Sequence, residues 1–382
     1  MARDINKRLN QLRIRRLGTD RLGQLNETAR DEVIAKSYLE EEYQKRAENQ
    51  PYTRYALGAM QEVDKDYTRI SIETAQRVGN QLENGLTSKG FSVEFRLQGS
   101  VPLNVHIRGV SDVDLLNLDT SFYTYHTQGA RSRAGLYTTP TSKTSIGVLS
   151  ALRSEAEKIL EARFPTATVD KSGGKAISIS GGSLARPVDV VPSHWYDTLE
   201  YQSSNQERDR GVTILNKKVP VTIDNLPFVH IHRVHTRDDQ TLGGLKKAIR
   251  LCKNVKNDAI EEGKTIVFPS FDIAATMYHA NLDALRASYI NELGVLAETQ
   301  RFLDELYHDG EKAKSLMVPD GSRRIFDTDE KYQGMRVLSL EMDDLAREVA
   351  KEQDILLSRR PEFSLSDGRI VLSKAYVPAA RN

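Results

Sequence analysis

Two aspartates separated by one residue, Asp112 and Asp114, are well suited to hold a metal ion. In a strand, residues i and i+2 point to the same side, so both carboxylates would project together while Val113 faces the core. Gly99-Ser100 lies upstream, and such a turn can offer backbone N–H groups to a phosphate. Carboxylates and substrate phosphates are the ligands that Mg²⁺ prefers. This combination predicts phosphoryl or nucleotidyl transfer.

A third carboxylate, Asp189, stands alone in an apolar strand pattern over residues 187–192. It is either an edge-strand aspartate near a turn or a third metal ligand supplied by a neighbouring strand. We favour the metal ligand, because two-metal nucleotidyl transfer needs a third carboxylate. That carboxylate holds the ion that activates the attacking hydroxyl, and it accepts the proton.

A basic stripe lies on a predicted helix over residues 242–255, formed by Lys246, Arg250 and Lys253. In most helices such a stripe is a solvated face. Here a triphosphate would need neutralising, and Lys253 is the best candidate for that contact. Ser270 would add a hydroxyl from the start of the next helix, where it would equally serve as a plain N-cap.

The apolar patterns that must position these residues divide the chain into helices, a sheet and further helices. Helical spacing dominates residues 1–89, with a new helix starting near Tyr52 and ending before Gly90. Strands are predicted at 92–98, 112–118, 176–180 and 187–191. Helices are predicted at 146–163, 240–262, 270–307, 310–317 and 336–358, with a loop at 121–144 and a partly ordered tail from 359. We expect an α+β fold in three parts: a helical segment (1–51), a catalytic core (52–225) and a helical C-terminal lobe (226–382).

Composition excludes several classes of protein. The 382 residues carry a formal charge of +1, which does not support an extended nucleic-acid track. The single cysteine, Cys252, rules out an intramolecular disulfide and fits a cytoplasmic location. No apolar run approaches the roughly 18 residues that span a bilayer, so we expect no membrane association.

The order of these motifs resembles the DNA polymerase β-like nucleotidyltransferases. Within them it most resembles the bacterial cGAS/DncV-like nucleotidyltransferases (CD-NTases) of CBASS anti-phage defence. The family pattern is Gly-Ser, a spacer, Asp-hydrophobic-Asp, and a lone Asp in a strand that ends in Pro. Gln98-Gly99-Ser100, Asp112-Val113-Asp114 and Val188–Pro192 match this pattern, and the resemblance covers about residues 52–300. By the same resemblance, Lys253 holds the donor triphosphate and Ser270 follows it.

The resemblance implies a bilobed polymerase β-like fold, in which a long N-terminal spine helix supports a mixed-sheet core and a helical C-terminal lobe closes over it. It implies that two Mg²⁺ ions per site, for which Mn²⁺ can substitute, bind Asp112, Asp114 and Asp189. The reaction implied is the joining of NTPs, ATP among them, into a cyclic di- or trinucleotide with release of pyrophosphate. The product would activate a separate effector protein.

Two features stay open. Trp195 and Tyr196 follow the third motif, where an aromatic ring would either stack on a nucleobase or pack in the core. The C-terminal tail, ending at Asn382, would be either a handle for a regulatory partner or simply disordered.

Two other functions compete with cyclic-nucleotide synthesis. A template-independent RNA-tailing or oligoadenylate-type enzyme would use the same carboxylates and give linear products. A catalytically silent nucleotide-binding scaffold is disfavoured, because such a protein need not keep all three acidic residues.

Overall fold

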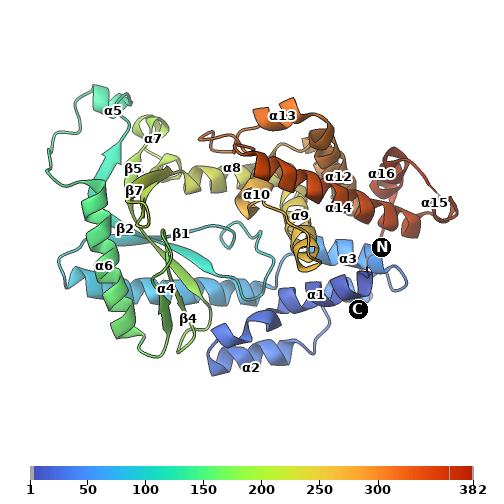
Figure 1. Ribbon diagram of the computed structural model, residues 1–382, viewed down its shortest axis with the longest axis horizontal. Coiled ribbons are helices and arrows are strands. Elements are labelled where there is room, and N and C mark those ends of the chain that lie inside the picture. The colour runs from blue at the N-terminus through green and yellow to red at the C-terminus, as the bar shows by residue number, and fades with distance from the viewer. Residues whose placement is uncertain (1–3, 361, 381–382) are drawn as a thin grey trace.

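The computed structural model describes residues 4–360 and 362–380, which form two lobes (Figure 1). One lobe contains the sheet, with helices α4 (Lys65–Thr87) and α6 (Ser145–Arg163) against it. The other lobe is helical and includes the C-terminal part of the chain. The α+β fold and the helical C-terminal lobe predicted from the sequence are confirmed.

The sheet has seven strands, in the order β1-β2-β5-β4-β3, with β6 paired to β5 and β7 paired to β6. The strands are β1 Val93–Gln98, β2 Val113–Tyr125, β3 Thr168–Asp170, β4 Ile177–Ser180, β5 Val188–Asp197, β6 Gly211–Asn216 and β7 Val221–Asn225. Strands β2 and β5 are parallel, and every other pair is antiparallel. The sheet is therefore mixed, and its parallel pair brings two segments far apart in the sequence side by side.

Alternation along β2 and β5 separates a buried face from a functional one. Val113 and Leu115 of β2 and Val188 and Val190 of β5 are buried in one hydrophobic cluster with α4 and α6. Because successive side chains of a strand point to opposite faces, the residues between them point away from these helices. The apolar residues thus fix which way the intervening aspartates point.

The remaining helices are α1 Ile5–Leu17, α2 Glu27–Lys36, α3 Pro51–Met60, α5 Ala130–Arg133, α7 Leu199–Ser204, α8 Pro227–Gln240, α9 Gly244–Glu261, α10 Ser270–Tyr278, α11 Leu282–Ala287, α12 Leu293–His308, α13 Gly310–Ser315, α14 Asp329–Gln353, α15 Ile355–Ser358 and α16 Leu365–Lys374. Short 3₁₀ turns lie at η1 Thr19–Gln24, η2 Glu42–Lys45 and η3 Glu207–Asp209. No helix in the described ranges combines the length and apolarity needed to cross a bilayer.

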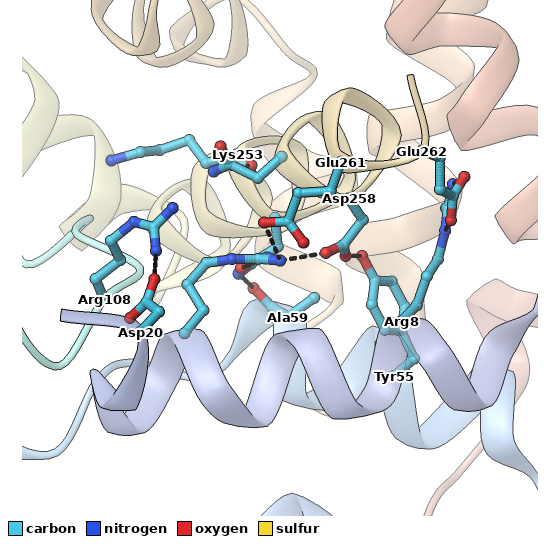
Figure 2. Close-up of polar contacts among 12 residues, drawn as sticks. Arg8, Asp20, Tyr55, Ala59, Arg108, Lys253, Asp258, Glu261 and Glu262 are labelled. Atoms are coloured by element: carbon cyan, nitrogen blue, oxygen red, sulfur yellow. Dashed lines mark hydrogen bonds and ion pairs between the residues drawn. The ribbon is translucent and has the colours of Figure 1, made fainter. Parts of the chain in front are cut away.

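The N-terminal helices pack against the C-terminal lobe through a buried polar network. Arg15 of α1 forms an ion pair with Asp258 of α9. Tyr55 of α3 donates a hydrogen bond to the same carboxylate (Figure 2). Arg8 adds a hydrogen bond of 2.6 Å to Glu262. The division at residues 51 and 225 stays a prediction, although α1 and α3 share one hydrophobic core with α9 and α14.

Several expected boundaries are wrong. The helix predicted from Tyr52 to Gly90 is two helices, because the chain is extended at Gln61 and restarts at the N-cap Asp64. The predicted loop at 121–144 contains the end of β2 and helix α5. Strands β6 and β7 were not predicted. The tail from residue 359 contains α16, capped by Ser364, so the expectation that it is only partly ordered stays a prediction.

Candidate functional site

The parallel pairing of β2 and β5 places Asp114 directly beside Asp189. Both side chains lie on the face that points away from α4 and α6, so two carboxylates from distant parts of the chain share one surface. Asp112 lies just before β2, which begins at Val113 rather than at residue 112 as predicted. The strand ladder therefore fixes Asp114 and Asp189, whereas Asp112 is held by other contacts.

Gly99 brings the backbone of the turn against Asp114. Its φ is 81° and its neighbour Gln98 pairs with Asp114 in the β1–β2 ladder. A Cβ at this position would overlap Asp114 Oδ2. A side chain would therefore be strained and would also push on the carboxylate, so only glycine fits.

The carboxylates perturb one another. Burial, and then the charges of Asp189 and Asp112, raise the pKa of Asp114 to about 7. Burial also raises the pKa of Asp189, while the hydrogen bond from the Ser178 hydroxyl opposes that rise. Ser178 is the partner of Asp189 across the antiparallel β4–β5 ladder. These carboxylates ionise reluctantly unless a cation joins them.

The acidic residues fit a divalent cation. Among the described residues, the Asp114 carboxylate has neither a hydrogen-bond nor an ion-pair partner. A largely buried carboxylate without a partner is costly, and hard oxygen donors are what Mg²⁺ takes. Within residues 4–360 and 362–380, no three acidic, His or Cys side chains are already grouped as a metal cluster, and Asp112 pairs instead with Arg21. Asp112, Asp114 and Asp189 would hold the ion once Asp112 joins the other two.

A cavity of about 360 Å³ opens beside Asp114 between the two lobes. It is lined by Gln98, Gly99, Ser100, Leu103, Val105, Asp114, Asn225, Pro227, His230, Ile231, Lys253, Ser270, Phe271 and Ala274. The structure thus brings together all five predicted nucleotide-binding residues, from β1 and its turn on one side and from α9 and α10 on the other. Asp112 and Asp189 are not among the lining residues.

Lys253 is the cation that faces this cavity. Its side chain is buried, and its Nζ donates a 2.6 Å hydrogen bond to the Val105 carbonyl. Burial, and then the charges of Lys256 and Arg250, lower the pKa of Lys253 to about 7. A phosphate group in the cavity would favour the charged ammonium. Ser270 is the first residue of α10, whose N-cap is Pro269, so Ser270 is not the N-cap itself.

The other residues of the basic stripe have structural contacts. Arg250 is buried and donates to the carbonyls of Met60 and Asn104, each at 2.7 Å. Lys246 forms an ion pair with Asp238 at 3.4 Å. Neither lines the cavity, so the stripe does not act as one phosphate-binding surface.

The aromatic residues after the third motif also lie outside the cavity. Trp195 is 3% exposed, packs against Phe228 and donates its indole N–H to Glu94. Tyr196 likewise does not line the cavity. In this structure Trp195 is a core residue, which was one of its two interpretations.

Sequence reasoning missed Phe271 and His230, which line the cavity and stack on each other with their ring centroids 4.3 Å apart. His230 is buried and makes no side-chain hydrogen bond within the described part of the chain. Burial lowers the pKa of His230 to about 4, so its ring is neutral at pH 7. The position of Phe271 directly after Ser270 was a usable signal. His230 stands out in the sequence only through its close spacing to His232 and His235, which suggests a metal site rather than a place in this cavity.

Comparison with known proteins agrees with this geometry. The C-terminal helical domain model of cGAS/DncV-like nucleotidyltransferases matches residues 232–345. The chain is 44% identical over 340 residues to the cyclic dinucleotide synthase CdnE of Yersinia aleksiciae, covering 89% of this chain and 87% of that protein. It is 31% identical over 313 residues to a c-di-GMP synthase of Capnocytophaga granulosa, covering 76% of this chain and 85% of that protein.

Solved structures match over the whole fold. The STING-associated CdnE c-di-GMP synthase from Capnocytophaga granulosa superposes with a TM-score of 0.68 at 26% identity, covering 90% of this chain and 97% of that one. A STING-associated CdnE c-di-GMP synthase from Flavobacteriaceae sp. has a TM-score of 0.72 at 22% identity, covering 92% and 99%, and supports the fold. Because a relative that is 44% identical matches 89% of this chain, the chain belongs to the cGAS/DncV-like nucleotidyltransferases (CD-NTases) and is a nucleotidyltransferase.

Proposed function

We propose that this enzyme joins two NTPs, ATP among the candidates, into a cyclic dinucleotide with release of pyrophosphate. The observation that carries the proposal is the cavity between the lobes, where the Gly99 turn, Asp114, Lys253 and Ser270 converge. The names of the CdnE and c-di-GMP synthase relatives support a cyclic dinucleotide over a trinucleotide. We further propose that a separate effector protein responds to the product in the cytoplasm.

Each residue has a role that its position supports. Lys253 and Ser270 bind the donor triphosphate, and the Gly99-Ser100 turn, which lines the same cavity, offers backbone N–H groups to a phosphate. Asp189 accepts the proton of the attacking hydroxyl, and Ser178 orients its carboxylate by donating to Oδ1. Mg²⁺ at the three aspartates would supply Lewis-acid polarisation and charge neutralisation when bound.

An RNA-tailing enzyme would use the same three aspartates, so the described residues of the site do not favour that alternative over cyclic-dinucleotide synthesis. A role of the tail in binding a regulatory partner stays a proposal. Arg46 contacts the Val377 and Pro378 carbonyls at 2.8 and 2.9 Å, while residues 381–382 lie outside the described residues.

Incubation with all four NTPs and Mg²⁺, followed by phosphatase treatment and mass spectrometry, tests the proposal. A phosphatase-resistant cyclic dinucleotide is expected, and Asp114→Asn should abolish it while the circular dichroism spectrum is unchanged. Linear products that grow on an added RNA primer would instead establish the tailing activity. Undiminished synthesis by Asp114→Asn would refute the assignment of the site.

A further inference from the structure

The loop that carries Asp112 is clamped by the end of α1 and by η1. The Gly109 N–H donates a 3.2 Å hydrogen bond to the Arg15 carbonyl. Arg108 forms an ion pair with Asp20 (Figure 2). A Cβ on Gly109 would overlap the Arg16 carbonyl oxygen, so the two segments are in direct backbone contact. Because Asp112 precedes β2, this N-terminal clamp helps to set its position.

Arg21, which lies in η1, contacts the Asp112 carboxylate directly. Its Nη1 donates to Asp112 Oδ1 at 2.8 Å and to the Val110 carbonyl at 3.3 Å. The Arg21 side chain is 25% exposed and that of Asp112 is 45% exposed. Among the described residues, Arg21 is the only Lys or Arg that forms an ion pair with any of the three aspartates of the site.

We propose that Arg21 is the resident counter-ion of the metal site and that a cation binding at Asp112 displaces it. The inference rests on the proposed function, since it assumes that Asp112 becomes a metal ligand. The ion pair occupies an Asp112 oxygen, and a guanidinium beside a divalent cation repels it. Arg21 therefore lowers the affinity for a free cation.

Coupling of metal loading to substrate binding follows from this competition. A triphosphate in the adjoining cavity adds negative charge that offsets both the arriving cation and the released Arg21 side chain. The cation should therefore bind much better with nucleotide than without it. The residue responsible comes from the N-terminal segment, outside the expected catalytic core.

Titration with Mn²⁺, followed by electron paramagnetic resonance of the free ion, measures this competition on the full chain without catalysis. Without nucleotide, Arg21→Gln should bind Mn²⁺ roughly three- to tenfold more tightly than wild type, as expected for removing one nearby positive charge at partly solvated sites. Arg21→Lys should stay near the wild-type affinity. With a non-hydrolysable NTP analogue, the difference between wild type and Arg21→Gln should shrink.

Arg108→Gln is the comparison variant, because Arg108 belongs to the same clamp through Asp20 and makes no ion pair with Asp112, on which its charge acts only at a distance. It should tighten Mn²⁺ binding less than Arg21→Gln does, because it leaves the Asp112 oxygen paired with Arg21. Equal or weaker binding by Arg21→Gln, or equal tightening by Arg108→Gln, would overturn the role of Arg21 while leaving the metal site standing. Failure of both wild type and Arg21→Gln to bind Mn²⁺, even with the analogue, would overturn the metal site and this inference together.

Discussion

Replacing Asp114 with asparagine should abolish synthesis and yet stabilise the protein when metal and nucleotide are withheld. In the fold, burial, and then the charges of Asp189 and Asp112, raise the pKa of Asp114 to about 7 from an ordinary 3.8. The folded state therefore keeps a proton that the unfolded state loses as pH rises above about 4. Stability falls as pH rises through this window, and the full penalty is present above about pH 7.

The size of the effect follows from this difference. The interval between 3.8 and about 7 is about 3 pH units, or about 4 kcal/mol at about 1.4 kcal/mol per unit. We expect about 2 to 4 kcal/mol at pH 8, because some water reaches the site and lowers the penalty. At about 0.8 kcal/mol per degree for a chain of this length, Tm should rise by about 3 to 5 °C.

Thermal unfolding of wild type and Asp114→Asn in EDTA, at pH 5 and at pH 8, measures this effect. The rise in Tm should be larger at pH 8 than at pH 5, because wild-type Asp114 stays mostly protonated at pH 5. Asp112→Asn is the matched control, since Asp112 is 45% exposed and already paired with Arg21. Its charge makes the smallest of the three contributions to the raised pKa of Asp114, so this variant should give at most a small part of the rise. A Tm for Asp114→Asn at or below wild type at pH 8, or an equal shift at both pH values, would refute the reasoning.

Three further substitutions test the rest of the site. Gly99→Ala should lower kcat for product formation about 100-fold, because the added methyl group displaces the Asp114 carboxylate. The assay uses protein whose circular dichroism spectrum matches wild type, and an unchanged kcat would contradict the close approach of Gly99 to Asp114. Ser178→Ala should raise the pKa of Asp189 further, because it removes the hydrogen bond that opposes the rise. The acidic limb of the pH–rate profile should therefore move to higher pH, and Ser178→Thr should restore it. An unmoved acidic limb in Ser178→Ala would exclude a role of Ser178 in orienting Asp189. Because burial lowers the pKa of Lys253 to about 7, wild-type affinity for an NTP analogue, measured by calorimetry, should fall as pH rises from 6 to 8.5. Lys253→Gln should bind the analogue more weakly and with little pH dependence. Equal affinities of wild type and Lys253→Gln would show that Lys253 does not contact the phosphates.

Local patterns were enough to find the strands that carry the chemistry. Apolar residues at alternate positions predicted a strand around Asp114 and another around Asp189, and both exist. Boundaries were less predictable, because a strand ends where its partner ends rather than where its own pattern weakens. Strand β2 continues to Tyr125 because β5 continues to Asp197 beside it.

The basic helix shows what a pattern cannot decide. Lys246, Arg250 and Lys253 share one helix face, but only Lys253 lines the cavity. Arg250 donates its hydrogen bonds to the carbonyls of Met60 and Asn104, which lie more than a hundred residues away in the sequence. Helical spacing predicts which residues share one face of a helix. The segments that pack against that face determine which of its side chains can reach a ligand.

By itself, the sequence determined the order of the turn, the acidic pair and the later aspartate, and with them the class of chemistry. It could do so because those residues sit in short segments whose alternation decides their direction. The tertiary structure alone decided that Asp114 lies beside Asp189, that Arg21 reaches Asp112, and that His230 and Phe271 line the cavity. Each of these contacts joins segments separated by tens of residues, so it depends on strand register and lobe packing rather than on local spacing.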